Sequence, residues 1–280
     1  MASFIALYNQ LGIACASDTD STIYRLSKKE PVAIAVNTSS LIPWEDIITL
    51  YLRKGEPTHH PTIGEYAKDF EAFLQEFPAN KKWNKLSNEE LKLIFLGYGK
   101  DDIYPSVYEF LIFVDKATEK MKLELCNKTL ISTFSSASLC TIGDWEYVSP
   151  ILRGSTISVA DSIDDYELEF YEAYKSVVKE RFKGTEYEEF VNNYFTEYDK
   201  SFEPRLATIA AESTLNKALI GIGTFSVEEL VSSAENLLNA NLRLKRLKFG
   251  GKGLIEITKT IAVLTRAEGF TWIKHCLFAI

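Results

Sequence analysis

The stretch MASFIALYNQLGIACASD, residues 1–18, decides the fold of this chain. Residues 4–8 and 13–16 form two short runs of apolar or small side chains, separated by a turn of four residues. Runs in which both alternating sets of positions are apolar are typical of neighbouring strands buried on both faces. We therefore predict a buried β-hairpin whose second strand ends on the carboxylate of Asp18.

The composition is that of an ordinary globular protein, with 280 residues, 46% of them hydrophobic and 25% charged. A chain of this kind buries a large core, and we predict a single domain over residues 1–280. The four cysteines, Cys15, Cys126, Cys140 and Cys276, are scattered without a CxxC pair. This favours reduced, packed thiols in a cytoplasmic protein over a disulfide framework.

Charge and hydropathy narrow the classes of partner. No run of about eighteen apolar residues and no secretory signal pattern is present, so we expect a cytoplasmic protein with no membrane contact. The net charge is −8, and residues 161–203 alone hold 13 acidic against 5 basic side chains. This balance argues against direct binding of nucleic acid, which requires a positive surface.

The first half of the chain reads mostly as sheet. Apolar runs predict strands at residues 22–26, 31–36, 91–97, 107–114 and 130–134, and the second of these is apolar on both faces and therefore central. We predict one helix from Pro43 to about Lys54. A second helix starts at Thr62, where Thr62 and Glu65 have the spacing of a capping box.

The second half begins helical and returns to strands. Aromatic and aliphatic residues recur at helical spacing over residues 164–199. A further capped helix opens with Ser226 and Glu229, and residues 260–264 and 270–273 read as two strands joined by a turn. The order of elements therefore predicts an α+β protein in which helices cover antiparallel sheets.

Three local patterns in this order resemble proteasome-type subunits of the N-terminal nucleophile (Ntn) hydrolase superfamily, including bacterial proteasome-like proteins. The first is the hairpin with ASD at residues 16–18, and the second is GSTISVADSIDD at residues 154–165. The third runs from SVEE at residues 226–229 through Gly250-Gly251 to IAVL at residues 261–264. Together the three patterns span nearly the whole chain.

The resemblance implies a four-layer αββα sandwich with an active site at one end of its two sheets, and it implies packing into rings. In such enzymes an N-terminal threonine, serine or cysteine is activated by its own amine, a lysine tunes that amine, and backbone N–H groups hold the oxyanion. The corresponding candidate catalytic residues here are Ser3, Asp18, Ser155 and Asp165.

Three requirements of that chemistry fail in this sequence. The family's spacing places the nucleophile at Ala2, which has no nucleophilic atom, and places the lysine at Thr22. The turn that matches the oxyanion loop, residues 36–40, contains no glycine. We therefore predict a pseudoenzyme that acts as a structural or partner-binding subunit of an oligomer, in which Asp18, Ser155 and Asp165 are structural.

The alternative is an active peptidase or amidohydrolase in which Ser3 becomes the N-terminal nucleophile after trimming, with Asp18 as its orienting carboxylate. This requires the loss of Met1 and Ala2 and a shift of the first strand by one residue. Such a shift turns every side chain of a strand to the opposite face.

Residues 166–223 have no counterpart in the family pattern, and we predict a helical insertion there. Its aromatic residues lie among carboxylates. They either form a surface for a protein partner or cover the small core of the insertion itself. No cofactor or metal site is predicted, because adjacent His59 and His60 point apart and Gly250-Gly251-Lys252-Gly253 follows a helix instead of opening one.

Overall fold

The computed structural model describes residues 3–19, 22–37, 42–54, 60–76, 91–115, 120–133, 137–143, 145, 172–196, 218–248 and 260–274. The chain divides into two compact units, one made of Met1–Tyr147 and Leu219–Ile280 and the other of Val148–Ala218. The first unit is an α+β structure with two antiparallel five-stranded sheets.

The first sheet is built around the predicted hairpin and has the strand order β10-β9-β2-β1-β8. Its strands are β1 (Phe4–Asn9), β2 (Ile13–Ser17), β8 (Ala137–Ile142), β9 (Thr260–Thr265) and β10 (Gly269–Lys274). In the hairpin Phe4 pairs with Ser17 and Tyr8 pairs with Ile13. Every residue of β1 and β2 is buried, which confirms the interpretation of both runs as strands covered on two faces.

The second sheet has the strand order β3-β4-β5-β6-β7. Its strands are β3 (Ile23–Arg25), β4 (Val32–Val36), β5 (Lys92–Gly97), β6 (Ser106–Asp115) and β7 (Lys120–Leu130). The predicted central strand is confirmed, because β4 pairs with both β3 and β5 and all its residues are buried.

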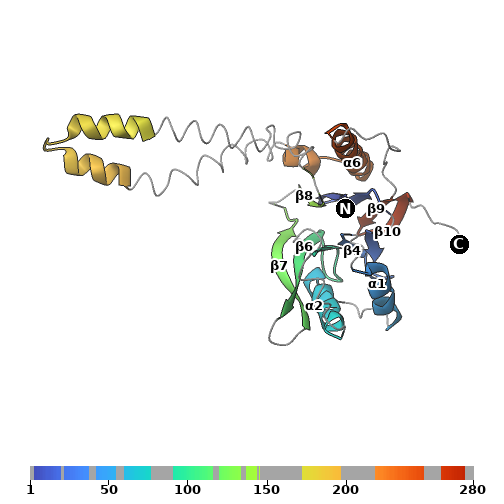
Figure 1. The fold of residues 1–280 in the computed structure, drawn as a ribbon. Helices are drawn as coiled ribbons and strands as arrows, with labels where there is room; N and C mark the ends of the chain where they lie inside the picture. Colours follow the sequence, from blue (N-terminus) through green and yellow to red (C-terminus); the bar gives the residue numbers. More distant parts are fainter. Residues whose placement is uncertain are drawn as a thin grey trace. The chain divides into compact units, whose positions relative to one another are not determined.

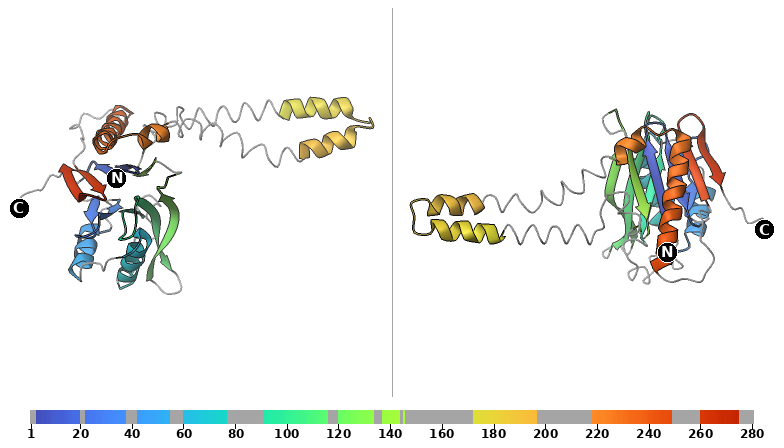
Figure 2. Two further views of the ribbon diagram at one scale, coloured as in Figure 1. Left: turned by 180° about the vertical axis from the view of Figure 1, so that it is seen from behind. Right: turned by 90° about the horizontal axis from the view of Figure 1, so that it is seen from above.

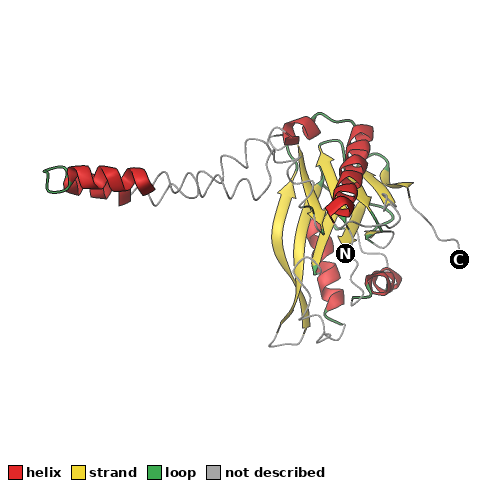
Figure 3. Ribbon diagram, turned by 45° about the horizontal axis from the view of Figure 1, so that its top comes forward, coloured by secondary structure: helices red, strands yellow, loops and turns green. Residues whose placement is uncertain are grey.

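Among the described residues of the first unit, three long helices pack on the outer faces of the sheets: α1 (Trp44–Arg53), α2 (Ile63–Leu74) and α6 (Val227–Lys248). A short helical segment, residues 218–223, packs in the same cluster as α6. Apolar side chains of α1 and α2 form one core cluster with β4 and β5. A second cluster fills the space between the sheets, and a third joins α6 to β1 and β2. The ribbon views show α6 on one outer side of the paired sheets and α1 and α2 on the other (Figures 1 and 3).

Two sequence predictions in this unit are wrong. The expected strand at 130–134 does not form; Leu130 instead ends β7, a strand that was not predicted from the sequence. The expected capping box at Thr62 is also absent, since its side chain makes no capping bond and the N–H of Glu65 donates to the backbone carbonyl of Thr62 (3.1 Å). The box at Ser226 does form, with reciprocal bonds of 2.7 and 3.2 Å to Glu229.

The described part of the second unit is a helical hairpin. Residues 172–182 and 188–196 are helical, and residues 183–187 form the turn between them. The helices run side by side in both views of Figure 2 and contact each other through Val178, Phe182, Val191 and Phe195. The prediction of helical structure in this acidic segment is confirmed for these residues. The predicted start of the insertion at residue 166 lies outside the described residues, whereas residues 218–223, at its predicted end, are helical, and residues 219–223 belong to the first unit.

Candidate functional site

Buried polar side chains gather where the first sheet and the second sheet meet at one end. Six of them are no more than 8% exposed: Ser3, Ser17, Asp18, Thr22, Asn37 and Thr260. Ser17 pairs with Thr260 across β2 and β9, and Asn37 directly follows β4. The hydroxyls of Thr19 and Thr22, which lie 2.5 Å apart, link the end of β2 to the start of β3. We call this group the polar end of the sheets.

Ser3 and Asp18 face each other across the extension of the β-hairpin. The backbone N–H of Ser3 donates to Oδ1 of Asp18 (2.8 Å), and the N–H of Asp18 donates to the carbonyl of Ser3 (3.2 Å). Ser3 is fully buried, and its Oγ has no hydrogen-bond partner among the described residues. The structure therefore brings two of the predicted site residues together, with the carboxylate held by a backbone donor.

The register of the hairpin decides which way Ser3 points. Side chains alternate along a strand, so Ser3 shares a face with Ile5 and Leu7. Those two residues belong to the cluster packed against α6, whereas Phe4 belongs to the cluster between the sheets. Ser3 therefore lies on the α6 side of β1 and not on the side that faces the second sheet.

Thr22, at the position where the resemblance implies a lysine, is fully buried. Its carbonyl accepts the N–H of Val36 (2.9 Å), and its hydroxyl contacts that of Thr19. A threonine hydroxyl carries no charge near neutral pH and cannot tune an amine as a lysine does. The residue thus joins two chain segments and brings no cation to the polar end.

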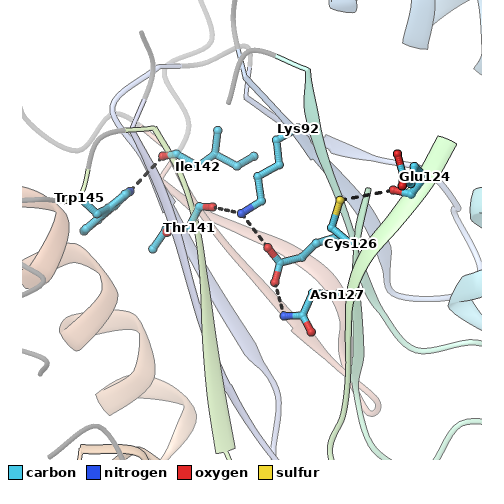
Figure 4. A network of polar contacts seen from close by, with 8 residues as sticks. Lys92, Glu124, Cys126, Asn127, Thr141, Ile142 and Trp145 are labelled. Atoms are coloured by element: carbon cyan, nitrogen blue, oxygen red, sulfur yellow. Dashed lines mark hydrogen bonds and ion pairs between the residues drawn. The ribbon is translucent and has the colours of Figure 1, made fainter. Parts of the chain in front are cut away.

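A polar network that the sequence did not predict ties the two sheets together beside β1. Nζ of Lys92 on β5 donates to the carbonyl of Thr141 on β8 (3.0 Å) and lies 2.7 Å from Oε2 of Glu109 (Figure 4). Oε1 of Glu109 accepts from Nδ2 of Asn127 (2.8 Å). Alternation places Lys92 and Glu109 on the inner face with Ile94 and Val107 of the inter-sheet cluster. The sequence signal that could have identified this network is that Lys92 and Glu109 stand at alternate positions with the inward-facing residues Ile94 and Val107.

The network acts on a neighbouring thiol. Burial raises the pKa of Cys140, and the Glu109 carboxylate raises it further. Burial likewise raises the pKa of Cys15, while Cys126 is exposed. A raised pKa keeps a thiol protonated and unreactive, so neither buried cysteine has the character of a nucleophile.

The other candidate residues divide by whether the structure describes them. Ala2, Ser155 and Asp165 lie outside the described residues. Within the described ranges, no group of three or more His, Cys, Asp or Glu side chains could hold a metal ion. His60 packs edge-on against Tyr66, with Nε2 3.8 Å from Oδ2 of Asp69. The described helices also include none long and apolar enough to cross a membrane.

The similarity of this chain to known proteins is found among solved structures. No family model matches the chain, and no curated protein matches it significantly. Among solved structures, the chain is similar to a selenomethionine-labelled Anbu (Gly-1) mutant from Hyphomicrobium sp. strain MC1. The match has 14% identity, covers 81% of this chain and 100% of that chain, and has a TM-score of 0.33.

Proposed function

We propose that the chain is a proteasome-like protein with the four-layer αββα sandwich of the Ntn hydrolases and a degenerate active site. It acts in the cytoplasm as a structural or partner-binding subunit of an oligomer. Support for the sandwich comes from the three apolar clusters, which place α6, two facing sheets and then α1 with α2 in succession. The described structure and the patterns quoted from the sequence are thus compatible with one architecture.

The main support for a loss of activity is the register of β1 against β2, in which Ser3 lies opposite Asp18. In this register the hydroxyl of Ser3 is buried on the α6 side of β1, away from the space between the sheets. Thr22 and Ala2 occupy the positions of the lysine and the nucleophile in the resemblance. Each difference removes a separate requirement of the reaction: the position of the Ser3 hydroxyl, the lysine that tunes the amine, or the nucleophilic atom at residue 2.

The bond to Asp18 opposes catalysis even in a chain that begins at Ser3. The atom that now donates to the Asp18 carboxylate at 2.8 Å would then be the free α-amine. A carboxylate at hydrogen-bond distance favours the protonated amine and raises its pKa. A protonated amine cannot accept the proton of the hydroxyl, so this geometry disables the base as well.

One observation favours the alternative, an active peptidase or amidohydrolase that uses Ser3. The Oγ of Ser3 is buried without a hydrogen-bond partner among the described residues, and Asp18 lies beside the same residue. A buried hydroxyl without a partner calls for an explanation, and a catalytic role is one such explanation. In this alternative, Ser3 reaches the space between the sheets only after β1 shifts by one residue.

Intact-mass spectrometry of the native protein, before and after treatment with an electrophile that labels N-terminal nucleophiles, separates the two functions. The proposal predicts a chain that retains Ala2 and carries no adduct. A chain that starts at Ser3 and carries one adduct, lost in Ser3→Ala and kept in Ser17→Ala, overturns it. Ser17 is a matched control because it is a buried serine at the same end of the sheets.

A further inference from the structure

The helical hairpin of residues 172–196 has a small core of its own and several large apolar side chains outside it. The core holds Val191 and Phe195, with Val178 and Phe182 packed against them. Five further residues are at least 53% exposed: Tyr174, Val177, Tyr187, Phe190 and Tyr194. A monomeric protein rarely exposes so many large apolar side chains within so short a segment.

The four exposed residues that lie within the helices share one face of the hairpin. Phe190 and Tyr194 each precede a core residue of their helix by one position, and Val177 likewise precedes Val178. Two antiparallel helices are related by a two-fold axis perpendicular to their common plane, so equivalent offsets from the core fall on the same side. Tyr174, three positions before Val177 and one turn before Val178, lies between this row and the core.

Ring contacts agree with this placement. The ring of Phe195 contacts Tyr194 of its own helix (centroids 5.5 Å apart) and Tyr174 of the other helix (6.3 Å). The opposite side of the hairpin carries Asn192 and Thr196, which follow the core residues Val191 and Phe195 by one position and are both exposed. The hairpin is therefore amphipathic as a whole, with one polar face and one face that we call the aromatic face: Tyr174, Val177, Phe190 and Tyr194, with Tyr187 at the adjoining turn.

We propose that the aromatic face binds the aromatic face of a second copy of this chain, so that two hairpins form a four-helix bundle. A two-helix unit with one apolar face is half of such a bundle, and four-helix bundles bury their apolar faces in this way. The inference stands on the hairpin alone and does not depend on the proposed loss of activity.

The area of the face suits a pair of copies. With aromatic side chains of roughly 200 Å² each, the exposed fractions correspond to about 550 Å² per copy and about 1,100 Å² for a pair. Specific interfaces begin at about 1,000 Å². In a two-fold symmetric pair, each copy covers the aromatic face of the other, because both copies contribute the same surface.

Charge does not oppose the pairing of like hairpins. Residues 172–196 contain 5 acidic and 4 basic side chains, a net charge of −1, although the wider segment 161–203 is strongly acidic. Two copies therefore repel each other little, and a basic partner gains little from this hairpin. The aromatic residues, and not the carboxylates, supply the surface for binding.

The test is cross-linking of lysines in the full chain, with light-nitrogen and heavy-nitrogen copies mixed after separate preparation. Mixed-isotope cross-links between hairpin lysines, such as Lys175 and Lys183, report contact between copies. The face variant Val177→Glu/Phe190→Glu is compared with Asn192→Glu/Thr196→Glu, which adds the same charge to the polar face. Far-UV circular dichroism checks that both variants keep their helices.

The proposal predicts mixed-isotope cross-links between hairpins in the native chain and in the polar-face variant, reduced by about tenfold or more in the face variant. The milder Tyr194→Ser variant lowers them without loss of helix. Absence of these cross-links in the native chain, or their persistence in the face variant, overturns the proposal. The first result would mean that something other than a second copy covers the face. The electrophile experiment on Ser3 is unaffected by either outcome.

Discussion

The backbone N–H of Ser3 donates a 2.8 Å hydrogen bond to Oδ1 of Asp18 at a place where neither residue is more than 8% exposed. This bond fixes the start of β1 against the end of β2. It also fixes the register that turns the Ser3 side chain toward α6. The carboxylate that the resemblance assigns to catalysis thus stabilises the hairpin.

Replacing Asp18 tests that structural role. We expect Asp18→Ala to lower the free energy of unfolding by about 1–3 kcal/mol, because a buried N–H loses its acceptor. Asp18→Asn, which keeps an oxygen at the same position, should cost clearly less. Urea unfolding of the three proteins measures both values. Equal stability of native protein and Asp18→Ala would show that the bond contributes nothing.

The Lys92–Glu109 pair predicts strong coupling between two substitutions. Both side chains are no more than 20% exposed, so Lys92→Met or Glu109→Leu alone leaves a largely buried charge without its partner. Removal of one partner of a buried pair costs about 3–5 kcal/mol, whereas removal of both is often far less harmful. We expect the double variant Lys92→Met/Glu109→Leu to lose less stability than the sum of its single variants. Additive losses in a double-mutant cycle would contradict the pairing.

The two candidate capping boxes predict stability losses of different size for the same kind of substitution. Ser226→Ala removes the Oγ that accepts the N–H of Glu229, and we expect a loss of about 1 kcal/mol in the free energy of unfolding. Thr62→Ala removes a side chain that makes no capping bond. Its loss should be smaller by a clear margin, as measured by thermal unfolding of the pair. A larger loss for Thr62→Ala would contradict the assignment of the caps.

Alkaline pH should destabilise the protein partly through Tyr66. Burial raises the pKa of this phenol from 10.0 to about 12, and its bond to Glu30 adds to the effect. A pKa raised in the folded state contributes stability that is full below pH 10 and lost as the pH rises toward about 12. Tyr66→Phe should therefore lose stability less steeply over that range than the native protein. Parallel slopes for the two proteins would refute this contribution.

Sequence patterns predicted those elements whose burial follows one simple period. The hairpin of β1 and β2 and the helix α6 are apolar where they are buried, so their patterns identify them. β7 was missed although residues 120–125 alternate charged and apolar side chains, which is itself a strand signal, because the alternation ends there and most of the remaining strand is exposed. The exposure of β7 follows from its position at the edge of the second sheet, where it pairs with β6 alone. That position depends on the tertiary structure and cannot be read from the local sequence.

The candidate site was predicted only in part. The sequence predicted that Asp18 ends the second strand of the hairpin, opposite the start of the first strand. The side of the sheet to which the Ser3 side chain points depends on a strand register that the sequence leaves open by one residue. The bond between Lys92 and Glu109 joins strands that are adjacent in the sheet, and the bond to Thr141 joins two sheets. Such contacts follow from tertiary packing and appear only in the three-dimensional structure.

The most direct test of the central claim is the mass of the native chain before and after exposure to an electrophilic probe for N-terminal nucleophiles. The account predicts that Ala2 is retained and that no adduct forms, because the Ser3 hydroxyl is buried on the α6 side and Thr22 replaces the lysine. A chain that begins at Ser3 and gains one adduct, lost in Ser3→Ala, would contradict it and establish a hydrolase.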